Sequence, residues 1–338
     1  MSAMIGSVAT RENEGLRRGN FRSARRKIAV ALLVLILLIQ VLAGSVGNWL
    51  GPWALHPPRR QLDPSMTLRA EQVFARAEAV LEDLDVRAPD GVLLKGWKVR
   101  PRTPNGDWVL LYHGQSDNRM GMIGYAELLL RLGYSVTLMD ARAHGASGGD
   151  MATYGWLERT DTRSVAGALY AGESVHCLFA LGESMGAAIA LQSAAVEPHI
   201  AGVVAESAFS SLREVSYDYA GFQMSPWLGR ILFRPASIYA LREIEREGNL
   251  PVDDVSPEAA VGARKFSVLL ICDGKDRQIP CAHSRRIYSA AGGTKALWVV
   301  ENAQHASALG TEPVAFKRRV GDFYAALHEH ASRHGRMN

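Results

Sequence analysis

Apolar runs of strand length recur through the chain from about residue 90 onward, and a helix-like segment follows most of them. Strands that alternate with helices are typical of an α/β fold, because neighbouring parallel strands need a long crossover that a helix can supply. The runs expected to be strands are Gly91–Val99, Trp108–Tyr112, Ser135–Met139, His176–Leu181, Gly202–Ala205, Ser267–Ile271 and Lys295–Val300. We therefore predict a mainly parallel central sheet flanked by helices.

One of these runs leads into a serine between two glycines. Residues 178–181 are apolar, residues 182–186 read Gly-Glu-Ser-Met-Gly, and an alanine-rich stretch follows. A strand, a G-x-S-x-G turn and a helix form the setting of a nucleophile elbow, in which glycines make room for a strained turn that exposes the serine hydroxyl. We predict that Ser184 is a catalytic nucleophile. The alternative is an ordinary glycine-rich turn with an inert serine.

A nucleophilic serine needs a base and an acid that orients the base. His305 is the expected base, because it lies in a loop after the last predicted strand. The acid should follow a strand between the serine and the histidine in chain order, and Asp276 is our choice. Asp273 in the same loop and Glu206 after an earlier strand are the alternatives.

Acyl transfer also needs hydrogen-bond donors for the negative oxygen of the tetrahedral intermediate. The backbone N–H of Met185, at the start of the helix after the serine, is one expected donor. The other is expected from the loop after the run 108–112, where we choose the N–H of Gln115, with Ser116 as the alternative. His113 in this loop is expected to shape it.

The segment 28–43 contains sixteen residues of which only Gln40 is polar, and a weaker apolar stretch extends it to residue 50. Seven basic and two acidic residues precede it, which predicts a membrane anchor with a cytoplasmic N-terminus and the body on the outer side. The alternative is a signal peptide cleaved after Ala43, which would leave a secreted protein. The predicted organisation is a basic leader at 1–27, a transmembrane anchor at 28–50, a connector at 51–80 and a folded domain at 81–338.

Residues 209–264 interrupt the alternation of strands and helices. Trp227, Leu228, Ile231 and Leu232 recur there at helical spacing without a clear strand. We expect a small helical insertion that caps the sheet.

Charge and cysteine content narrow the classes of function. The net charge is +4, and residues 1–27 alone carry +5, so the body is close to neutral and nucleic acid is not an expected partner. The three cysteines, Cys177, Cys272 and Cys281, imply neither a disulfide framework nor a zinc site, and the first and second are expected to pack as small apolar side chains. No P-loop, dinucleotide fingerprint or metal-ligand spacing occurs, so we expect no cofactor and no metal.

The ordered motifs resemble the α/β-hydrolase superfamily, in the branch with monoacylglycerol lipase-like, serine aminopeptidase-like and membrane-anchored bacterial hydrolases. The resemblance covers about residues 88–328. The motifs that carry it are His113-Gly114, the segment Asp140–Gly148, the turn Gly182–Gly186, Asp276 with Ile279-Pro280, and His305. It implies an α/β-hydrolase fold and a triad of Ser184, Asp276 and His305. The family usually has His-Gly where this chain has Cys272-Asp273, so Asp273 stays open as the acid.

These observations predict a membrane-anchored serine hydrolase that cleaves a carboxylic ester through an acyl-enzyme on Ser184. Its expected partners are a small ester or acyl substrate and, through the N-terminal helix, a membrane. A serine peptidase or amidase is the alternative enzyme, because the same triad cleaves amides. A non-catalytic binding protein of the same fold is the alternative outside enzymes.

Overall fold

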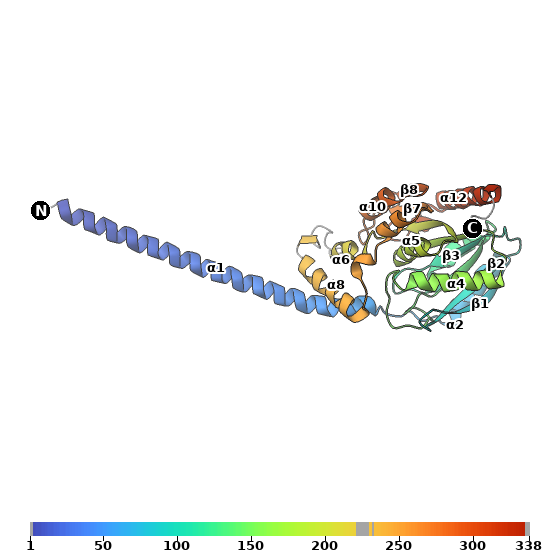
Figure 1. The fold of residues 1–338 in the computed structure, drawn as a ribbon, viewed down its shortest axis with the longest axis horizontal. Coiled ribbons are helices and arrows are strands. Elements are labelled where there is room, and N and C mark those ends of the chain that lie inside the picture. Colours follow the sequence, from blue (N-terminus) through green and yellow to red (C-terminus); the bar gives the residue numbers. More distant parts are fainter. Residues whose placement is uncertain (1–2, 221–229, 232, 335–338) are drawn as a thin grey trace.

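A long N-terminal helix projects from an α/β body (Figure 1). The structure, a computed structural model, describes residues 3–220, 230–231 and 233–334. Its strands are β1 (Ala79–Arg87), β2 (Leu93–Pro101), β3 (Trp108–Tyr112), β4 (Ser135–Met139), β5 (Leu178–Glu183), β6 (Ile200–Glu206), β7 (Ser267–Asp273) and β8 (Lys295–Val300). Its α-helices are α1 (Ala3–Leu55), α2 (Pro64–Arg76), α3 (Ile123–Leu130), α4 (Glu158–Gly172), α5 (Met185–Val196), α6 (Leu212–Ala220), α8 (Arg234–Gly248), α9 (Pro257–Ala263), α10 (Ala282–Ala290), α11 (Ala308–Thr311) and α12 (Pro313–His334), with short 3₁₀ helices η1 (Arg119–Met122) and η2 (Val252–Asp254).

The eight strands form one sheet in the order β1-β2-β4-β3-β5-β6-β7-β8. All neighbours from β4 to β8 run parallel, whereas β1 and β2 pair antiparallel with each other and β2 pairs antiparallel with β4. The predicted mainly parallel sheet is therefore confirmed. The antiparallel edge strand β1 is an addition, since the sequence analysis predicted no strand there.

Successive side chains of the central strand β3 point to opposite faces of the sheet, because side chains alternate along a strand. Val109 and Leu111 are buried with α2, α3 and α12, while Trp108 and Leu110 are buried with α4, α5, α9 and α10. An unbroken apolar run is thus what a strand covered on both faces needs. The helices form one layer on each side of the sheet, and the carboxyl ends of the parallel strands share one edge.

Residues 209–264, the expected cap insertion, contain α6, α8, η2 and α9 within their described part. Trp227, Leu228 and Leu232 of the expected helical spacing lie outside the described residues, and the side chain of Ile231 is 60% exposed. A third apolar cluster joins α6 and α8 to the start of α5. The insertion therefore lies over the carboxyl edge of the sheet.

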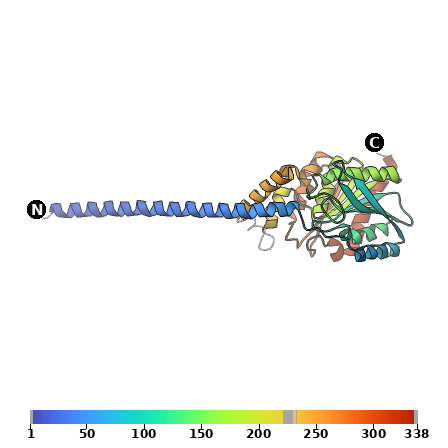
Figure 2. The ribbon, with the colours of Figure 1, turned by 90° about the horizontal axis from the view of Figure 1, so that it is seen from below.

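Helix α1 ends against the insertion, alongside α8 (Figures 1 and 2). A Cβ atom on Gly47 would lie 2.5 Å from the backbone oxygen of Ala236, so the absence of a side chain permits this close approach of the two helices. Leu55 at the end of α1 is fully buried in the third apolar cluster. Residues 51–80, which the sequence analysis assigned to a connector, hold this end of α1 and also α2, whose Phe74 is buried against the sheet.

We predict that alanine is tolerated at Gly44 but not at Gly47. In a helix, alanine is favoured over glycine by about 1 kcal/mol. At Gly44 the new Cβ meets only ring carbons of Tyr239 at 3.8 Å, so this gain should raise the melting temperature. At Gly47 the clash with the backbone of α8 should cost about 1–3 kcal/mol and lower the melting temperature.

Thermal unfolding of the full chain in a mild detergent measures both variants, and Gly44→Ala is the control for helix propensity. Equal shifts for the two variants would contradict the observed contact between α1 and α8.

Candidate active site

Ser184 lies at the turn between β5 and α5, with backbone angles φ 54° and ψ −119°. Positive φ is uncommon for a residue with a side chain and costs energy that the surroundings must supply. A Cβ on Gly182 would lie 2.3 Å from the oxygen of Gly186, and a Cβ on Gly186 would lie 2.1 Å from the oxygen of Tyr112. Both glycines of the motif are therefore required by close backbone contacts around Ser184.

The structure brings Ser184, His305 and Asp276 together, as the sequence analysis expected of a triad. The Ser184 hydroxyl lies 2.9 Å from Nε2 of His305, and Nδ1 of His305 lies 2.7 Å from Oδ2 of Asp276. The three residues follow β5, β8 and β7, whose carboxyl ends meet at the edge of the sheet beneath the insertion. This arrangement allows a proton to pass from Ser184 to His305 while Asp276 orients the ring.

The Asp276 carboxylate is buried and held by further hydrogen bonds. Its Oδ1 accepts from the backbone N–H groups of Gln278 and Ile279 at 2.8 and 2.9 Å, and its Oδ2 accepts from the Ser207 hydroxyl at 2.9 Å. These donors fix the direction of the carboxylate toward the histidine. Asp273, the alternative acid, accepts from the same Ser207 hydroxyl at 2.7 Å.

Glu206, the third candidate, has different partners. Its carboxylate accepts from the Tyr125 hydroxyl at 2.9 Å and from the backbone N–H of Ala308 at 2.7 Å. It thereby supports the segment that follows His305 in the chain.

The two expected oxyanion donors belong to the start of α5 and to the loop after β3. Met185 is the first residue of α5, where a backbone N–H has no partner within the helix. Gln115 belongs to the loop after β3, and the neighbouring Gly114 approaches Ser184 so closely that a Cβ on it would lie 3.7 Å from the serine Cβ. In this loop Ser116, the alternative donor, has φ 61°.

Hydrogen bonds of His113 fix the path of that loop. Its Nδ1–H donates to the oxygen of Gly114 at 2.8 Å, and its Nε2 accepts from the N–H of Ala141 at 3.0 Å. Burial lowers the pKa of His113, so the ring is neutral and can accept at Nε2. The ring thus joins the loop after β3 to the loop after β4.

Comparisons with known proteins identify the relatives of this chain. Residues 104–251 match the model of a hydrolase family described as serine aminopeptidase, S33. The protein YqkD of Bacillus subtilis is 30% identical over 239 residues, which are 69% of this chain and 75% of the relative. YfhR of Escherichia coli K12 is 26% identical over 251 residues, or 72% and 77% of the two chains.

The solved structures that resemble it include esterases. The Pyrococcus furiosus esterase Pf2001 superposes with a TM-score of 0.64 at 24% identity, covering 81% of this chain and 98% of the esterase. An esterase of Exiguobacterium antarcticum superposes with a TM-score of 0.54 at 17% identity, covering 72% and all of the two chains. This chain belongs to the α/β-hydrolase superfamily. It is a serine hydrolase.

A disulfide between Cys272 and Cys281 corrects the expectation for the cysteines of this hydrolase. The sequence predicts Cys272 as a small apolar side chain and implies no disulfide framework. The bond joins the end of β7 to the residue before α10, and it closes a ring around the loop that carries Asp276. The spacing of nine residues matches no recognised cysteine motif, so the sequence alone did not signal the pairing.

Two glutamates beneath the site of this hydrolase share one hydrogen-bond donor, and no sequence pattern marks them as a pair. The Tyr125 hydroxyl lies 3.0 Å from Glu183 and 2.9 Å from Glu206. Burial raises the pKa of Glu183 to about 7, and burial next to Asp273 raises the pKa of Glu206. Carboxyl groups with raised pKa values cluster at functional sites, because burial that excludes water from reacting groups also disfavours charge.

We predict that Glu183 makes the hydrolase less stable as the pH rises from about 4.5 to about 7. Its pKa is about 7 when folded and 4.5 as a model group, so within this window the folded chain holds a proton that the unfolded chain has lost. The contribution of Glu183 to the free energy of unfolding should therefore fall across the window and level off above it. Glu183→Gln should reduce this slope.

Denaturant unfolding between pH 4.5 and 8 measures the slope. The control is Glu71→Gln, which changes an exposed carboxyl on α2 and should leave the slope as it is in the parent chain. No difference in slope between Glu183→Gln and the parent chain would contradict the assignment.

Proposed function

We propose that this protein is a membrane-anchored serine hydrolase that cleaves carboxylic esters through an acyl-enzyme on Ser184. The observation that carries the proposal is the continuous hydrogen-bonded series from Ser184 Oγ through His305 to Asp276, with separations of 2.9 and 2.7 Å. Two structural neighbours, both esterases, support the choice of reaction.

In the first half of the proposed reaction, His305 Nε2 takes the proton of Ser184 as Oγ attacks the carbonyl carbon. The resulting imidazolium keeps its Nδ1–H bonded to the Asp276 carboxylate, which stabilises the positive charge. The negative oxygen of the tetrahedral intermediate accepts from the N–H groups of Met185 and Gln115. His305 then gives its Nε2 proton to the leaving oxygen, the alcohol departs, and the acyl group stays on Ser184.

In the second half, water replaces the alcohol. His305 takes a proton from the water as its oxygen attacks the acyl carbon, and a second tetrahedral intermediate forms against the same donors. When this intermediate collapses, Ser184 Oγ leaves and recovers its proton from His305. The products are a carboxylic acid and the free enzyme, so no cofactor is consumed.

A serine peptidase or amidase is the second candidate, because the matching family model is described as a serine aminopeptidase. The proposed proton transfers serve an amide equally well, with His305 protonating the leaving nitrogen instead of an oxygen. The two candidates therefore differ in the leaving atom that His305 protonates.

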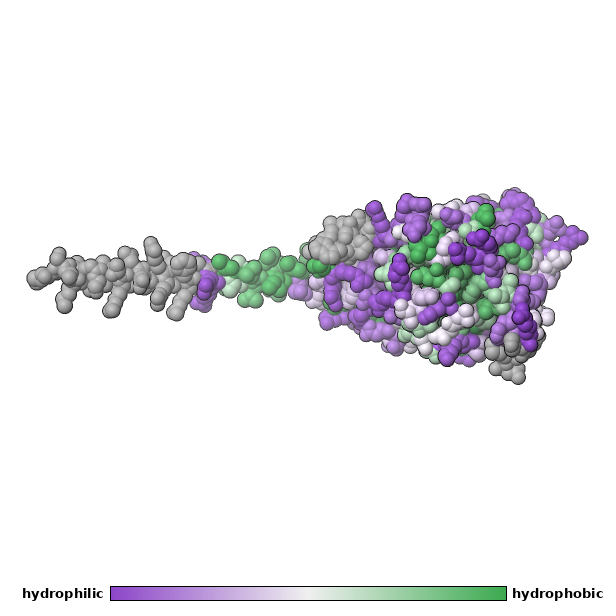
Figure 3. All heavy atoms as spheres, turned by 90° about the horizontal axis from the view of Figure 1, so that it is seen from above, coloured by the Kyte–Doolittle hydropathy of each residue, from purple (hydrophilic) through white to green (hydrophobic). Residues whose placement is uncertain are grey.

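The anchor is proposed from the apolar surface of α1. Residues 25–55 form a helical stretch that is long and apolar enough to cross a membrane, although a signal sequence meets the same criteria. Large apolar side chains of residues 28–42 are about half or more exposed, and Figure 3 shows them as a green stretch between the basic residues 25–27 and the body. Basic residues before the stretch favour a cytoplasmic N-terminus.

Two further features favour a location of the folded body on the outer side of the membrane. Trp49 and Trp53 are exposed at the end of the stretch nearest the body, where interfacial aromatic side chains are common. The disulfide between Cys272 and Cys281 is typical of an oxidising compartment.

We predict that the full chain hydrolyses p-nitrophenyl esters and that Ser184→Ala lowers kcat at least about 10⁴-fold. A series from acetyl to palmitoyl, assayed in detergent, measures the preferred acyl length. The full chain is used because Leu55 and the end of α1 are part of the folded body. If no ester is turned over while a fluorophosphonate probe still labels Ser184, the peptidase or a narrow substrate range replaces the ester proposal.

The same assay distinguishes the two aspartates near His305. Asp276→Asn should lower kcat about 10⁴-fold, because the amide no longer holds the productive tautomer of His305. Asp273→Asn should lower it far less, since Asp273 bonds to Ser207 and acts on the ring only indirectly. The reverse order would make Asp273 the acid.

We predict that the mature protein retains residues 28–43 and stays in the membrane fraction after alkaline extraction. N-terminal sequencing and mass spectrometry of the purified chain measure this. A mature chain that begins at or just after Gly44 would replace the anchor by a cleaved signal peptide and a secreted enzyme.

A further inference from the structure

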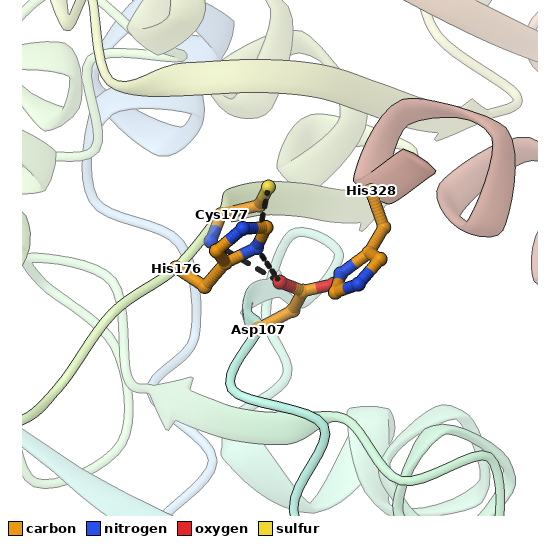
Figure 4. Close-up of side chains that lie close together, drawn as sticks. All are labelled: Asp107, His176, Cys177 and His328. Atoms are coloured by element: carbon orange, nitrogen blue, oxygen red, sulfur yellow. Dashed lines mark hydrogen bonds and ion pairs between the residues drawn. The ribbon is translucent and has the colours of Figure 1, made fainter. Parts of the chain in front are cut away.

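A cluster of metal-ligating side chains lies at the opposite edge of the sheet from Ser184 (Figure 4). Asp107 directly precedes β3, His176 and Cys177 directly precede β5, and His328 lies on α12. Each of these residues offers one oxygen, nitrogen or sulfur atom, and these atoms all lie within 4.8 Å of one another. Six residues of β5 separate Cys177 from the catalytic turn, a distance of about 20 Å along the strand.

The Asp107 carboxylate is the centre of the cluster. Its Oδ1 lies 3.1 Å from Nδ1 of His176, and its Oδ2 lies 2.8 Å from Nδ1 of His328. Cys177 Sγ lies 3.3 Å from Nδ1 of His176, and the backbone N–H of Cys177 donates to Oδ1 of Asp107 at 3.1 Å. Figure 4 shows the two imidazoles on either side of the carboxylate and the sulfur close to His176.

One side of this cluster is buried, and the other side is open to solvent. The side chain of Asp107 is fully buried, and Cys177 is 5% exposed. The side chains of His176 and His328 are each 34% exposed, so an ion can reach the nitrogen atoms from solvent without unfolding of the sheet. A buried carboxylate between two imidazoles is also a place where positive charge is favoured.

We propose that this cluster is a structural zinc site, with ligands from Asp107, His176, Cys177 and His328. Zinc prefers four ligands drawn from thiolate, imidazole and carboxylate groups, and this set of one sulfur, two nitrogens and one oxygen fits that preference. Tetrahedral bonds of about 2.0–2.3 Å place ligand atoms about 3.3–3.6 Å apart. Three of the contacts measure 2.8–3.3 Å and all the ligand atoms lie within 4.8 Å of one another, so side-chain movements of about 1 Å would admit the ion.

Protons leave the site as the ion enters. The Cys177 thiol loses its proton to solvent and binds as a thiolate. Each imidazole binds through Nδ1 as the neutral ring, so its remaining proton is on Nε2. The Ser332 hydroxyl oxygen lies 3.5 Å from Nε2 of His176 and can accept a hydrogen bond from this N–H, which would orient the ring.

The ion would tie helix α12 to the sheet. Three side chains of α12, Phe316, Val320 and Tyr324, are fully buried against the sheet, and His328 lies one turn beyond the last of them. The other ligands precede two central strands, so the ion joins segments that are far apart in the sequence. A competing explanation is that the hydrogen bonds to Asp107 alone make this connection, without any metal.

Cobalt binding to the full-length, tag-free protein in detergent separates the two explanations. After treatment with a chelator, one equivalent of Co²⁺ should give the absorption bands of tetrahedral cobalt and a thiolate-to-cobalt charge-transfer band. One equivalent of Zn²⁺ should displace it and raise the melting temperature. Absence of stoichiometric binding would overturn the proposal and leave the hydrogen-bonded network.

Variants test whether the bound ion is at this cluster. His328→Ala should weaken cobalt binding at least about 100-fold, because loss of a ligand costs at least as much as loss of an outer partner. Cys177→Ser should abolish the charge-transfer band, and His330→Ala, which changes an exposed histidine of the same helix, should change neither property. Binding that neither His328→Ala nor Cys177→Ser affects would overturn the proposal by placing the ion elsewhere.

The fold of each variant is checked independently of the metal. Circular dichroism and ester hydrolysis in the presence of chelator should match the parent chain, because the cluster lies at the edge of the sheet away from Ser184. This check also keeps the zinc proposal separate from the proposed function, since cobalt spectra need no substrate.

Discussion

The turn at Ser184 is the constraint on which the arrangement of the carboxyl edge depends. A backbone φ of 54° persists only where the surrounding structure enforces it, and here three strands contribute. The end of β3 lies against Gly186, and the N–H of Ser184 donates to the oxygen of Glu206 at the end of β6 at 2.9 Å. Because β3, β5 and β6 are neighbours in one parallel sheet, their register fixes the turn, and the turn in turn fixes where α5 begins.

Buried acidic groups beneath this turn give the carboxyl edge an unusual electrostatic environment. Glu206 and Asp273 end β6 and β7, Asp276 follows β7, and Ser207 donates to both aspartates. Burial raises the pKa of Asp273, while backbone donors hold Asp276 directed toward His305. The two neighbouring aspartates thus differ in environment, because burial opposes charge on Asp273 whereas backbone N–H groups fix the direction of the Asp276 carboxylate.

The sequence predicted those features that depend on local patterns. The turn around Ser184, the apolar strands and the order of serine, acid and histidine each leave a signature within a few residues. It did not predict β1, an edge strand in which only Val86 is buried, nor the pairing of Cys272 with Cys281. The cluster around Asp107 could not be predicted from the sequence either, because its side chains come from three distant segments that only the folded sheet brings together.

The end of α1 is joined to the expected oxyanion loop through Tyr154, which connects the proposed anchor with the proposed chemistry. The Tyr154 hydroxyl donates to the backbone oxygen of Ala54 at 2.6 Å and accepts from the side-chain Nε2 of Gln115 at 2.9 Å. A helix that packs on α8 and ends in the apolar cluster of the insertion is a rigid connection, unlike a flexible linker. If α1 crosses a membrane as we propose, this connection holds the insertion and the loop of Gln115 close to the bilayer surface, where lipid-like esters are concentrated.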